Sequence, residues 1–280
     1  MKLQIATCRP LPEPDVDEDL LLAALSAVGV DACMVPWQEE AAFEPAVPTL
    51  IRSTWDYIHH LDAFLLWVRR RAAQGSLWNP ASVVTENLHK GYLLKLEQAG
   101  IPITPTALVA RGSTCSLFDI ATDSGWQEIV VKPAVGAGSY ETYRRNVERG
   151  MDESDFQRLL LQRDMLVQGY LPSVEEHGER ALVWIAGQFT HAVRKSPRFA
   201  GGVESVSNAV EISSAEHALG ERIIGMLPDD LLYARVDVAP DHRGEPVLME
   251  LELVEPSLFL QQNPAALQRF AAAIRSRLLI

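Results

Sequence analysis

The chain has 280 residues, 48% of them hydrophobic, and a formal net charge of −12, and this length and core content predict two or three subdomains instead of one compact unit. The acidic balance argues against a nucleic-acid partner, and the lack of a long apolar run argues against a membrane span. The three cysteines are widely spaced, which argues against a disulfide framework or a structural zinc site. We therefore expect a cytoplasmic protein without nucleic-acid or membrane partners.

The first 84 residues have the pattern of an open α/β domain. Residues 17–28 begin with acidic residues, continue with a dense apolar stripe and stop at Gly29, as is typical of a helix. The expected elements are strands at 3–6, 33–35 and 49–51 and helices at 17–28 and 60–73. This order predicts an N-terminal open α/β domain over residues 1–84.

The remaining chain divides into two segments, residues 85–170 and 171–280. Alternating apolar residues on both sides of Ala186-Gly187 predict a hairpin in the second segment. The expected elements are helices at 89–99, 152–162, 215–226 and from Pro264 onward, and strands at 128–132, 165–168, 181–185, 189–193, 232–238 and 247–253. We interpret the two segments as a central and a C-terminal α+β subdomain.

The last pair of expected strands gathers charged residues on one face. Because side chains alternate along a strand, Arg235 and Asp237 share a face on the first strand, and Leu248, Glu250 and Glu252 share a face on the second. The opposite face is apolar and must lie on a core. Two interpretations stay open: a solvated face on which Arg235 neutralises an acid, or a site for a divalent cation such as Mg²⁺, which prefers carboxylate oxygens.

A glycine-rich turn follows another expected strand, in the sequence IVVKPAVGAGS (129–139). The strand ends with Lys132, and the turn holds Gly136, Gly138 and Ser139. Small residues allow backbone N–H groups to approach phosphate oxygens, and the lysine adds a positive charge. The lysine precedes the glycines, which excludes a P-loop. A simple flexible turn is the alternative interpretation.

An extended linker leaves the strand at 165–168 and leads into an acidic loop. Its residues can present backbone groups to a purine edge, and the carboxylate of Glu179 can bind ribose hydroxyls. The alternative is an acidic surface loop without a ligand. The linker residues concerned are Gln168, Gly169, Tyr170 and Leu171.

Taken together, these motifs resemble the ATP-grasp superfamily in order and spacing, over essentially the whole chain. The shared motifs are Lys90, 129–139, Gly178-Glu179, Lys195, ARVDV (234–238) and LMELELVEPS (248–257). Further similarities to the branch that contains cycloserine synthetase, the O-ureido-serine cyclo-ligase, lie at 52–57, 78–80, 191–193 and 250–259. The resemblance implies an α/β ATP-grasp fold of three subdomains, with ATP between the central and the C-terminal one.

The resemblance also implies how the nucleotide and the metal would be bound. Phosphates, adenine, ribose and Mg²⁺ would each contact a separate group of residues. These groups are Lys90, Lys132 and Lys195 at the phosphates, Gly136, Gly138 and Ser139 over them, Gln168, Gly169, Tyr170 and Leu171 at adenine, Glu179 at ribose, and Asp237, Glu250 and Glu252 at Mg²⁺.

For the reaction, the resemblance implies that a small-molecule carboxylate is activated as an acyl phosphate and forms an amide-type bond. Arg235 would steady the acyl phosphate and the tetrahedral intermediate, with Lys132 and Lys195 as further catalytic residues. The loop at 196–202 is shorter than expected for the cycloserine branch, which predicts a different lining of the substrate pocket. The residues that would face the substrate are Arg52, Ser53, Thr54, Asp56 and Ser257.

Three functions stay open from the sequence. The leading one is an ATP-dependent ligase that closes a ring within one amino-acid-derived substrate. The second joins two molecules, as in dipeptide or glutathione synthesis, and the third is a nucleotide-binding protein without turnover. A set of intact charged residues favours the ligases, because a binding protein need not keep Arg235 and every carboxylate. The sequence leaves the oligomeric state open, a homodimer included.

Overall fold

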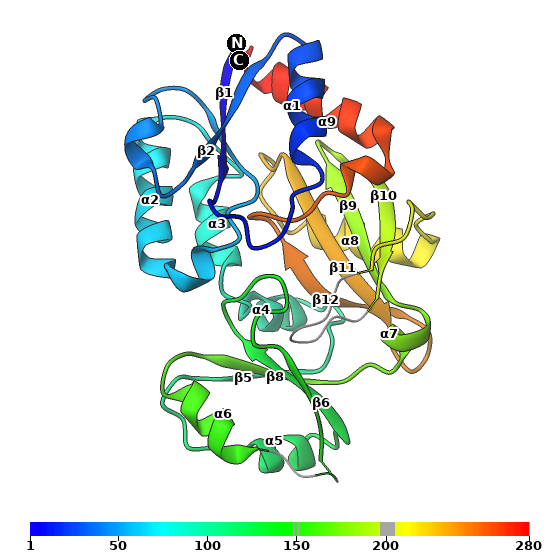
Figure 1. Cartoon of the computed structure of the whole chain (residues 1–280). Coiled ribbons are helices and arrows are strands. Elements are labelled where there is room, and N and C mark those ends of the chain that lie inside the picture. The colour runs from blue at the N-terminus through cyan, green and yellow to red at the C-terminus, as the bar shows by residue number, and fades with distance from the viewer. Residues whose placement is uncertain (148, 150–151, 197–204, 280) are drawn as a thin grey trace.

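The computed structural model describes residues 1–147, 149, 152–196 and 205–279. Within these ranges the chain forms three four-stranded sheets that follow one another along the sequence (Figure 1). The shortened loop expected at 196–202 lies almost wholly outside the described residues. Every helix in these ranges is too short or too polar to cross a membrane.

The N-terminal sheet is parallel, with strand order β2-β1-β3-β4. Five of the six residues of β1 are buried, because helices cover both faces of a parallel sheet. Helix α2 directs Phe64, Trp67 and Val68 inward, at the spacing of one helical face. The elements are β1 (Lys2–Thr7), α1 (Glu18–Ala27), β2 (Asp31–Pro36), η1 (Glu40–Ala42), β3 (Thr49–Ile51), η2 (Tyr57–His59), α2 (Leu61–Gln74) and β4 (Leu77–Trp78).

The central sheet is antiparallel, with strand order β5-β8-β6-β7. Helices α5 and α6 pack together on one side of it, away from the rest of the molecule (Figure 1). Ser116 and Asp152 cap these two helices by accepting a backbone N–H of the first turn. The elements are α3 (Ala81–Asn87), α4 (Tyr92–Gln98), β5 (Thr106–Val109), α5 (Leu117–Asp123), β6 (Glu128–Pro133), β7 (Tyr143–Asn146), α6 (Glu153–Leu160) and β8 (Met165–Gly169).

The C-terminal sheet is also antiparallel, with strand order β10-β9-β11-β12. Ser213 and Glu216 form a capping box at the start of α8, and Asn263 caps α9 directly before Pro264. The elements are α7 (Ser173–Glu176), β9 (Glu179–Ile185), β10 (Gln188–Lys195), α8 (Ser214–Ile224), β11 (Tyr233–Pro240), β12 (Pro246–Glu252), η3 (Leu260–Gln262) and α9 (Pro264–Arg277).

The alternation expected along β12 is interrupted by a bulge. Asp237 pairs with Glu250, but the next residue of β11, Val238, pairs with Leu248, so that Met249 is an extra residue. A bulge of this kind shifts the side chains beyond it by one position. Leu248 is therefore buried in the apolar core and Met249 lines the pocket, the reverse of what strict alternation predicts. The charged residues keep the face that was expected for them.

The N-terminal and C-terminal sheets share one hydrophobic core. Helix α9 returns to the start of the chain and packs beside α1, so that both termini lie at the same end of the molecule (Figure 1). Phe270 of α9 contacts Tyr233 of β11, with ring centroids 6.0 Å apart, in a cluster that also holds Leu3 and Ile5 of β1. The buried Asn79 side chain donates to the carbonyls of Tyr233 and Leu253, both at 2.9 Å. The two sheets are thereby fixed to each other.

Candidate active site

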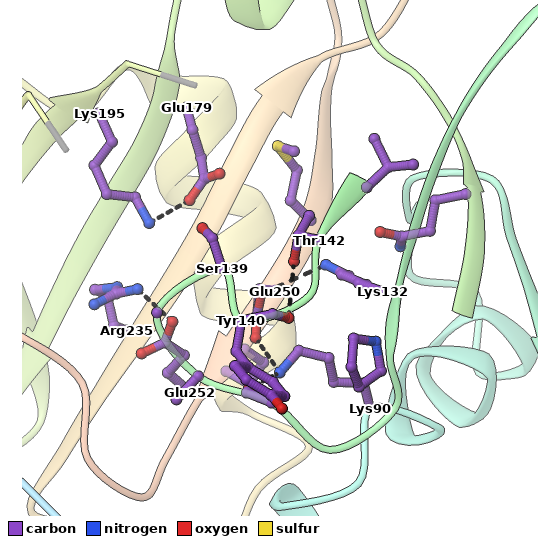
Figure 2. A pocket seen from close by; sticks show the side chains of 18 of the residues that line it. Lys90, Lys132, Ser139, Tyr140, Thr142, Glu179, Lys195, Arg235, Glu250 and Glu252 are labelled. Atoms are coloured by element: carbon purple, nitrogen blue, oxygen red, sulfur yellow. Dashed lines mark hydrogen bonds and ion pairs between the residues drawn. The ribbon is translucent and has the colours of Figure 1, made fainter. Parts of the chain in front are cut away.

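A pocket lies between the central and C-terminal sheets, and residues of the N-terminal domain close one end of it. Side chains from β6, β9, β10, β11 and β12 point toward one another there, under the glycine-rich loop (Figure 2). Most of the residues expected to bind a nucleotide or a substrate line this one pocket. They are Lys90, Lys132, Gly136, Gly138, Ser139, Gln168, Gly169, Tyr170, Leu171, Glu179, Lys195, Arg235, Glu250, Glu252 and Ser257.

Two lysines from different parts of the chain meet one carboxylate. The backbone N–H of Lys90 donates to the carbonyl of Ala134 at 2.7 Å, which fixes this lysine beside the glycine-rich loop. Its Nζ lies 2.7 Å from Glu250 Oε1 and donates to the Gly136 carbonyl at 2.6 Å. Lys132 Nζ lies 3.6 Å from Oε2 of the same carboxylate. Burial alone would raise the pKa of Glu250, but the two lysines hold it below its ordinary value.

A second group of charges lies beside the first, around a buried aspartate. Arg235 donates from Nε and Nη2 to the two oxygens of Asp237, both at 2.8 Å, and Lys195 donates to the same carboxylate at 2.8 Å. Burial would raise the pKa of Asp237, but the two cations hold it below its usual range. Lys195 also pairs with Glu179, and Arg235 with Glu252. Burial raises the pKa of Glu179 to about 7 and that of Glu252 to about 8, since each shares its cation with the aspartate.

The carboxylates of the pocket fit a magnesium ion that is shared with a bound phosphate chain. Within the described residues, no three His, Cys, Asp or Glu side chains form a metal-binding group by themselves. Glu250 and Glu252 nevertheless supply hard oxygen donors at the pocket wall, and Mg²⁺ is commonly bound by one or two carboxylates together with substrate phosphates. Asp237 lies below them, 1% exposed, and does not line the pocket.

The glycine-rich loop covers the lysines. Gly138 and Ser139 follow each other with φ of 57° and 60°, a left-handed pair that turns the chain sharply over the pocket. Ser139, Tyr140 and Thr142 lie in front of Lys132 and Glu250 in Figure 2. The Tyr140 ring also meets His59 of the N-terminal domain edge-on, with centroids 5.0 Å apart. The loop therefore spans from the central sheet to the N-terminal domain.

The linker that follows β8 also lines the pocket. Gln168 donates to Thr106 Oγ1 at 2.8 Å, and the N–H of Tyr170 donates to the carbonyl of Glu128 at 2.9 Å. Gly169 packs closely on Trp126, because a Cβ there would lie 3.1 Å from the Trp126 ring nitrogen, a tight contact. These bonds hold the linker from Gln168 to Leu171 extended along the pocket, as the sequence predicts for a purine-binding segment.

Four residues expected to face the substrate lie behind the pocket wall instead. Arg52 donates to the carbonyl of Pro256 at 2.9 Å, the hydroxyls of Ser53 and Thr7 are 2.9 Å apart, and Thr54 is fully buried. Asp56 likewise accepts a hydrogen bond of 2.7 Å from the Trp37 indole. Their neighbours Trp55 and Tyr57 line the pocket in their place. The turn at 53–57 thus presents Trp55 and Tyr57 to the pocket, which its sequence alone does not reveal.

Several residues of the pocket were not identified as site residues from the sequence. Glu13 comes from the loop after β1, and Glu255 from the segment after β12. Asn87 and Tyr92 flank Lys90 and also reach the pocket wall. Glu255 could have been found from the sequence, because it begins the motif EPSLF (255–259). The loop around Glu13 has no periodic pattern that would have indicated a site residue.

Comparisons with known proteins agree with this geometry. A family model described as the N-terminal domain of D-cycloserine synthetase DcsG matches residues 3–79. The cycloserine biosynthesis protein DcsG of Streptomyces lavendulae is 29% identical over 287 aligned residues, covering 94% of each chain. The crystal structure of D-cycloserine synthetase DcsG is similar with a TM-score of 0.87 and 28% identity, covering 99% of this chain and 100% of that one.

More distant structures share the fold. The ATP-grasp ligase PsnB, in complex with a precursor variant, Mg and ADP, has a TM-score of 0.64 at 15% identity, over 98% of this chain and 97% of that one. A D-alanine–D-alanine ligase from Bacillus anthracis has a TM-score of 0.68 at 14% identity, over 99% and 96%. The predicted ATP-grasp fold is thereby confirmed, as is the predicted similarity to cycloserine synthetase.

Proposed function

We propose that this chain uses ATP and Mg²⁺ to convert the carboxylate of a small amino-acid-like substrate into an acyl phosphate, and that it then joins the acyl group to an amine. Its fold and its relatives are those of an ATP-grasp ligase. The carrying observation is the convergence of three lysines, one arginine and the carboxylates of Glu250 and Glu252 on one pocket under a glycine-rich loop. Phosphoryl transfer depends mainly on positioning and on stabilising charge, which such a set of side chains provides.

The nucleotide would lie along the pocket from the linker to the lysines. Adenine would contact the segment from Gln168 to Leu171, and Glu179 would bind a ribose hydroxyl. Lys90, Lys132 and Lys195 would meet the phosphates, with Gly136, Gly138 and Ser139 over them. Support comes from the positions of these residues, because the linker and the three lysines line opposite parts of one continuous pocket.

Magnesium would be bound by Glu250 and Glu252, with Asp237 completing the predicted set of ligands. Bound there, the metal would neutralise charge that develops on the phosphates during transfer. Lys90 and Lys132 neutralise Glu250 in the structure, and arriving phosphates would attract both lysines. This exchange of partners would free the Glu250 carboxylate for the ion.

Two chemical steps would follow at Arg235. In the first, a carboxylate oxygen of the substrate forms a bond to the γ-phosphorus, the bond from that phosphorus to the β–γ bridging oxygen breaks, and ADP leaves. In the second, the amine nitrogen bonds to the acyl carbon, loses a proton, and inorganic phosphate leaves. The Arg235 guanidinium is 6% exposed and lies at the pocket wall, where it would stabilise the negative oxygen of the tetrahedral intermediate.

The substrate would bind at the end that the N-terminal domain closes. Ser257 lines that region and would contact the substrate, while its carbonyl accepts from Arg235 at 3.2 Å. Arg52, Ser53, Thr54 and Asp56 would act from behind, by fixing the wall that Trp55 presents. Ring closure within one substrate is the form of the reaction favoured by the similarity to D-cycloserine synthetase over nearly the whole chain.

A phosphate-release screen tests the proposal. Amino acids and their O- and N-substituted derivatives are supplied with ATP, with Mg²⁺ or with EDTA, and each product is weighed by mass spectrometry. We expect ADP and phosphate to form only with Mg²⁺ and a suitable carboxylate. A product equal to one substrate minus water indicates cyclisation, whereas two substrates minus water indicates joining. Nucleotide binding without any release across the panel would contradict the ligase proposal.

A further inference from the structure

One carboxylate of the pocket differs from the others in its partners. Four neighbouring acids are each ion-paired with a lysine or an arginine: Glu179, Asp237, Glu250 and Glu252. Glu255, by contrast, is in no ion pair within the part of the chain that the structure describes. It lines the same pocket, beyond the phosphate-facing lysines and next to the N-terminal domain. Its charge therefore has no counter-charge of its own.

The surroundings of Glu255 are built from two aromatic residues. The Tyr57 hydroxyl interacts with its carboxylate, and the Trp55 indole donates to its backbone carbonyl at 3.0 Å. Burial raises the pKa of Glu255 to about 7, against the lowering effects of the Tyr57 hydroxyl, the Lys90 charge and its own backbone N–H. Lys90 itself is already bonded to Glu250 and Gly136. The backbone bond and the tyrosine thus hold the carboxylate in place without neutralising it.

A carboxylate in this position favours a small cation in the space beside it. Burying an unpaired charge is costly, and a ligand that brings the opposite charge removes that cost. Trp55 and Tyr57, which line the same pocket, bring no positive charge to it. The groups that bind anions lie elsewhere, at Arg235 and the three lysines.

We propose that Glu255, between Trp55 and Tyr57, binds the protonated amino group of the substrate. The inference rests on the proposed ligase function and narrows the substrate class to zwitterions. The carboxylate of such a molecule is phosphorylated near Arg235 while its ammonium group lies against Glu255. The distance between these two residues then selects substrates by the spacing of their charged groups.

Binding of two matched probes tests this assignment without turnover. The probes are O-methylserine and 3-methoxypropionate, which differ only in the amino group. Each probe, with O-methylserine as both enantiomers, is titrated calorimetrically into protein saturated with Mg²⁺ and a non-hydrolysable ATP analogue. We expect the wild type to bind one enantiomer of O-methylserine at least about tenfold more tightly than 3-methoxypropionate, as one charge-assisted hydrogen bond allows. Glu255→Gln should abolish that preference, and Glu255→Asp should restore part of it.

Two controls separate this assignment from the function on which it rests. Affinity for the ATP analogue should stay within about twofold in Glu255→Gln, because the substitution leaves the lysines unchanged. Glu245→Gln, on the exposed turn between β11 and β12, should bind both probes like the wild type. A preference that persists in Glu255→Gln, equal binding of the two probes, or binding of neither at millimolar concentration overturns the assignment. Failure to bind the ATP analogue at all would instead refute the ligase function.

Discussion

The buried carboxylates of the pocket have pKa values displaced in opposite directions, according to how many cations each one meets. Glu250 faces two lysines, and its pKa is lowered against the effect of burial. Glu179 shares Lys195 with Asp237, so burial prevails and raises its pKa to about 7. Among the described residues that line the pocket, carboxylates thus outnumber the lysines and the arginine. A bound cation, from magnesium or from a substrate, relieves this excess.

This excess predicts that the ligand-free protein loses stability as the pH rises. The native state keeps the proton of Glu179 up to a pH of about 7, whereas the unfolded chain releases it near the ordinary glutamate pKa of 4.5. Between these pH values the native state binds more protons, so stability falls with rising pH. The loss for this residue is about 2 kcal/mol after allowance for solvent screening.

Melting temperatures of Glu179→Gln and the wild type, measured from pH 4.5 to 8, check this prediction. The variant cannot ionise at this position, so its melting temperature should fall less steeply over the same range. Glu211→Gln, a substitution at an exposed position, should leave the wild-type slope unchanged. Identical slopes for Glu179→Gln and the wild type would show that the carboxylate is already ionised at low pH.

At the scale of elements, the segment from α3 to α4 aligns two parts of the pocket. β12 is an edge strand, and its outer backbone groups are bonded by side chains of this segment. The Asn87 amide donates to the Leu251 carbonyl at 2.9 Å and accepts from the Leu253 N–H at 2.8 Å. The Tyr92 hydroxyl accepts from the Leu251 N–H at 2.9 Å. Since Lys90 lies between these residues, the bonds set its position relative to the carboxylates of β12.

We therefore predict that Asn87→Leu weakens both stability and nucleotide binding. The substitution leaves a part-buried carbonyl and N–H of β12 without partners, at a cost of about 1–3 kcal/mol, and it frees Lys90 to shift away from Glu250. Thermal unfolding and titration with ATP and Mg²⁺ measure the two effects. Glu86→Gln, on the exposed face of the same helix, serves as the control. An Asn87→Leu protein that binds nucleotide with wild-type affinity would contradict the positioning role.

The elements with strong periodicity were predictable from the sequence, and those defined by tertiary contacts were not. Strands such as 49–51 and 128–132 were recognised from their apolar runs, and they correspond to β3 and β6. The helix expected at 89–99 is shorter, since it begins only at Tyr92, after a turn that brings Lys90 to Ala134. Helix α3 was missed, because its seven residues gain their stability from bonds to β12, which no local pattern encodes.

The same distinction applies to the site. Arg235 and the carboxylates of β11 and β12 were identified because strand alternation places their side chains on one face. The glycine-rich loop was identified from its small residues after Lys132, and Lys90 and Lys195 from the resemblance to the ATP-grasp superfamily. The bulge at Met249 and the inward turn at 53–57 were not identified from the sequence, because both depend on how a neighbouring strand or loop packs. Glu255 gained its significance only in three dimensions, where the described residues form no ion pair with it.

At the scale of the whole molecule, the chain folds back so that its last helix joins the first domain. The core around Phe270 includes residues of β1, α1 and β11, which lie in different subdomains. Such a shared core predicts that the N-terminal and C-terminal sheets unfold together. It also fixes the wall formed by Trp55 and Tyr57 relative to Glu255, and hence the closed end of the pocket.

Phe270→Ala should destabilise both sheets at once, by about 3–5 kcal/mol, the range for removing a large buried aromatic side chain. Urea unfolding followed by far-ultraviolet circular dichroism and by tryptophan fluorescence measures the effect, and both signals should shift together. Arg275→Ala, at an exposed position of the same helix, should have little effect. Separate transitions for the two signals in the wild type would show that the subdomains are independent.

Transfer of labelled oxygen tests the proposed chemistry most directly. A substrate found by the phosphate-release screen is prepared with ¹⁸O in its carboxylate and turned over with unlabelled ATP in unlabelled water. If the carboxylate attacks the γ-phosphorus, one of its oxygens must leave with the phosphate. We therefore expect one ¹⁸O atom in each phosphate released, detected by mass spectrometry. Phosphate that carries no ¹⁸O would contradict the acyl phosphate intermediate.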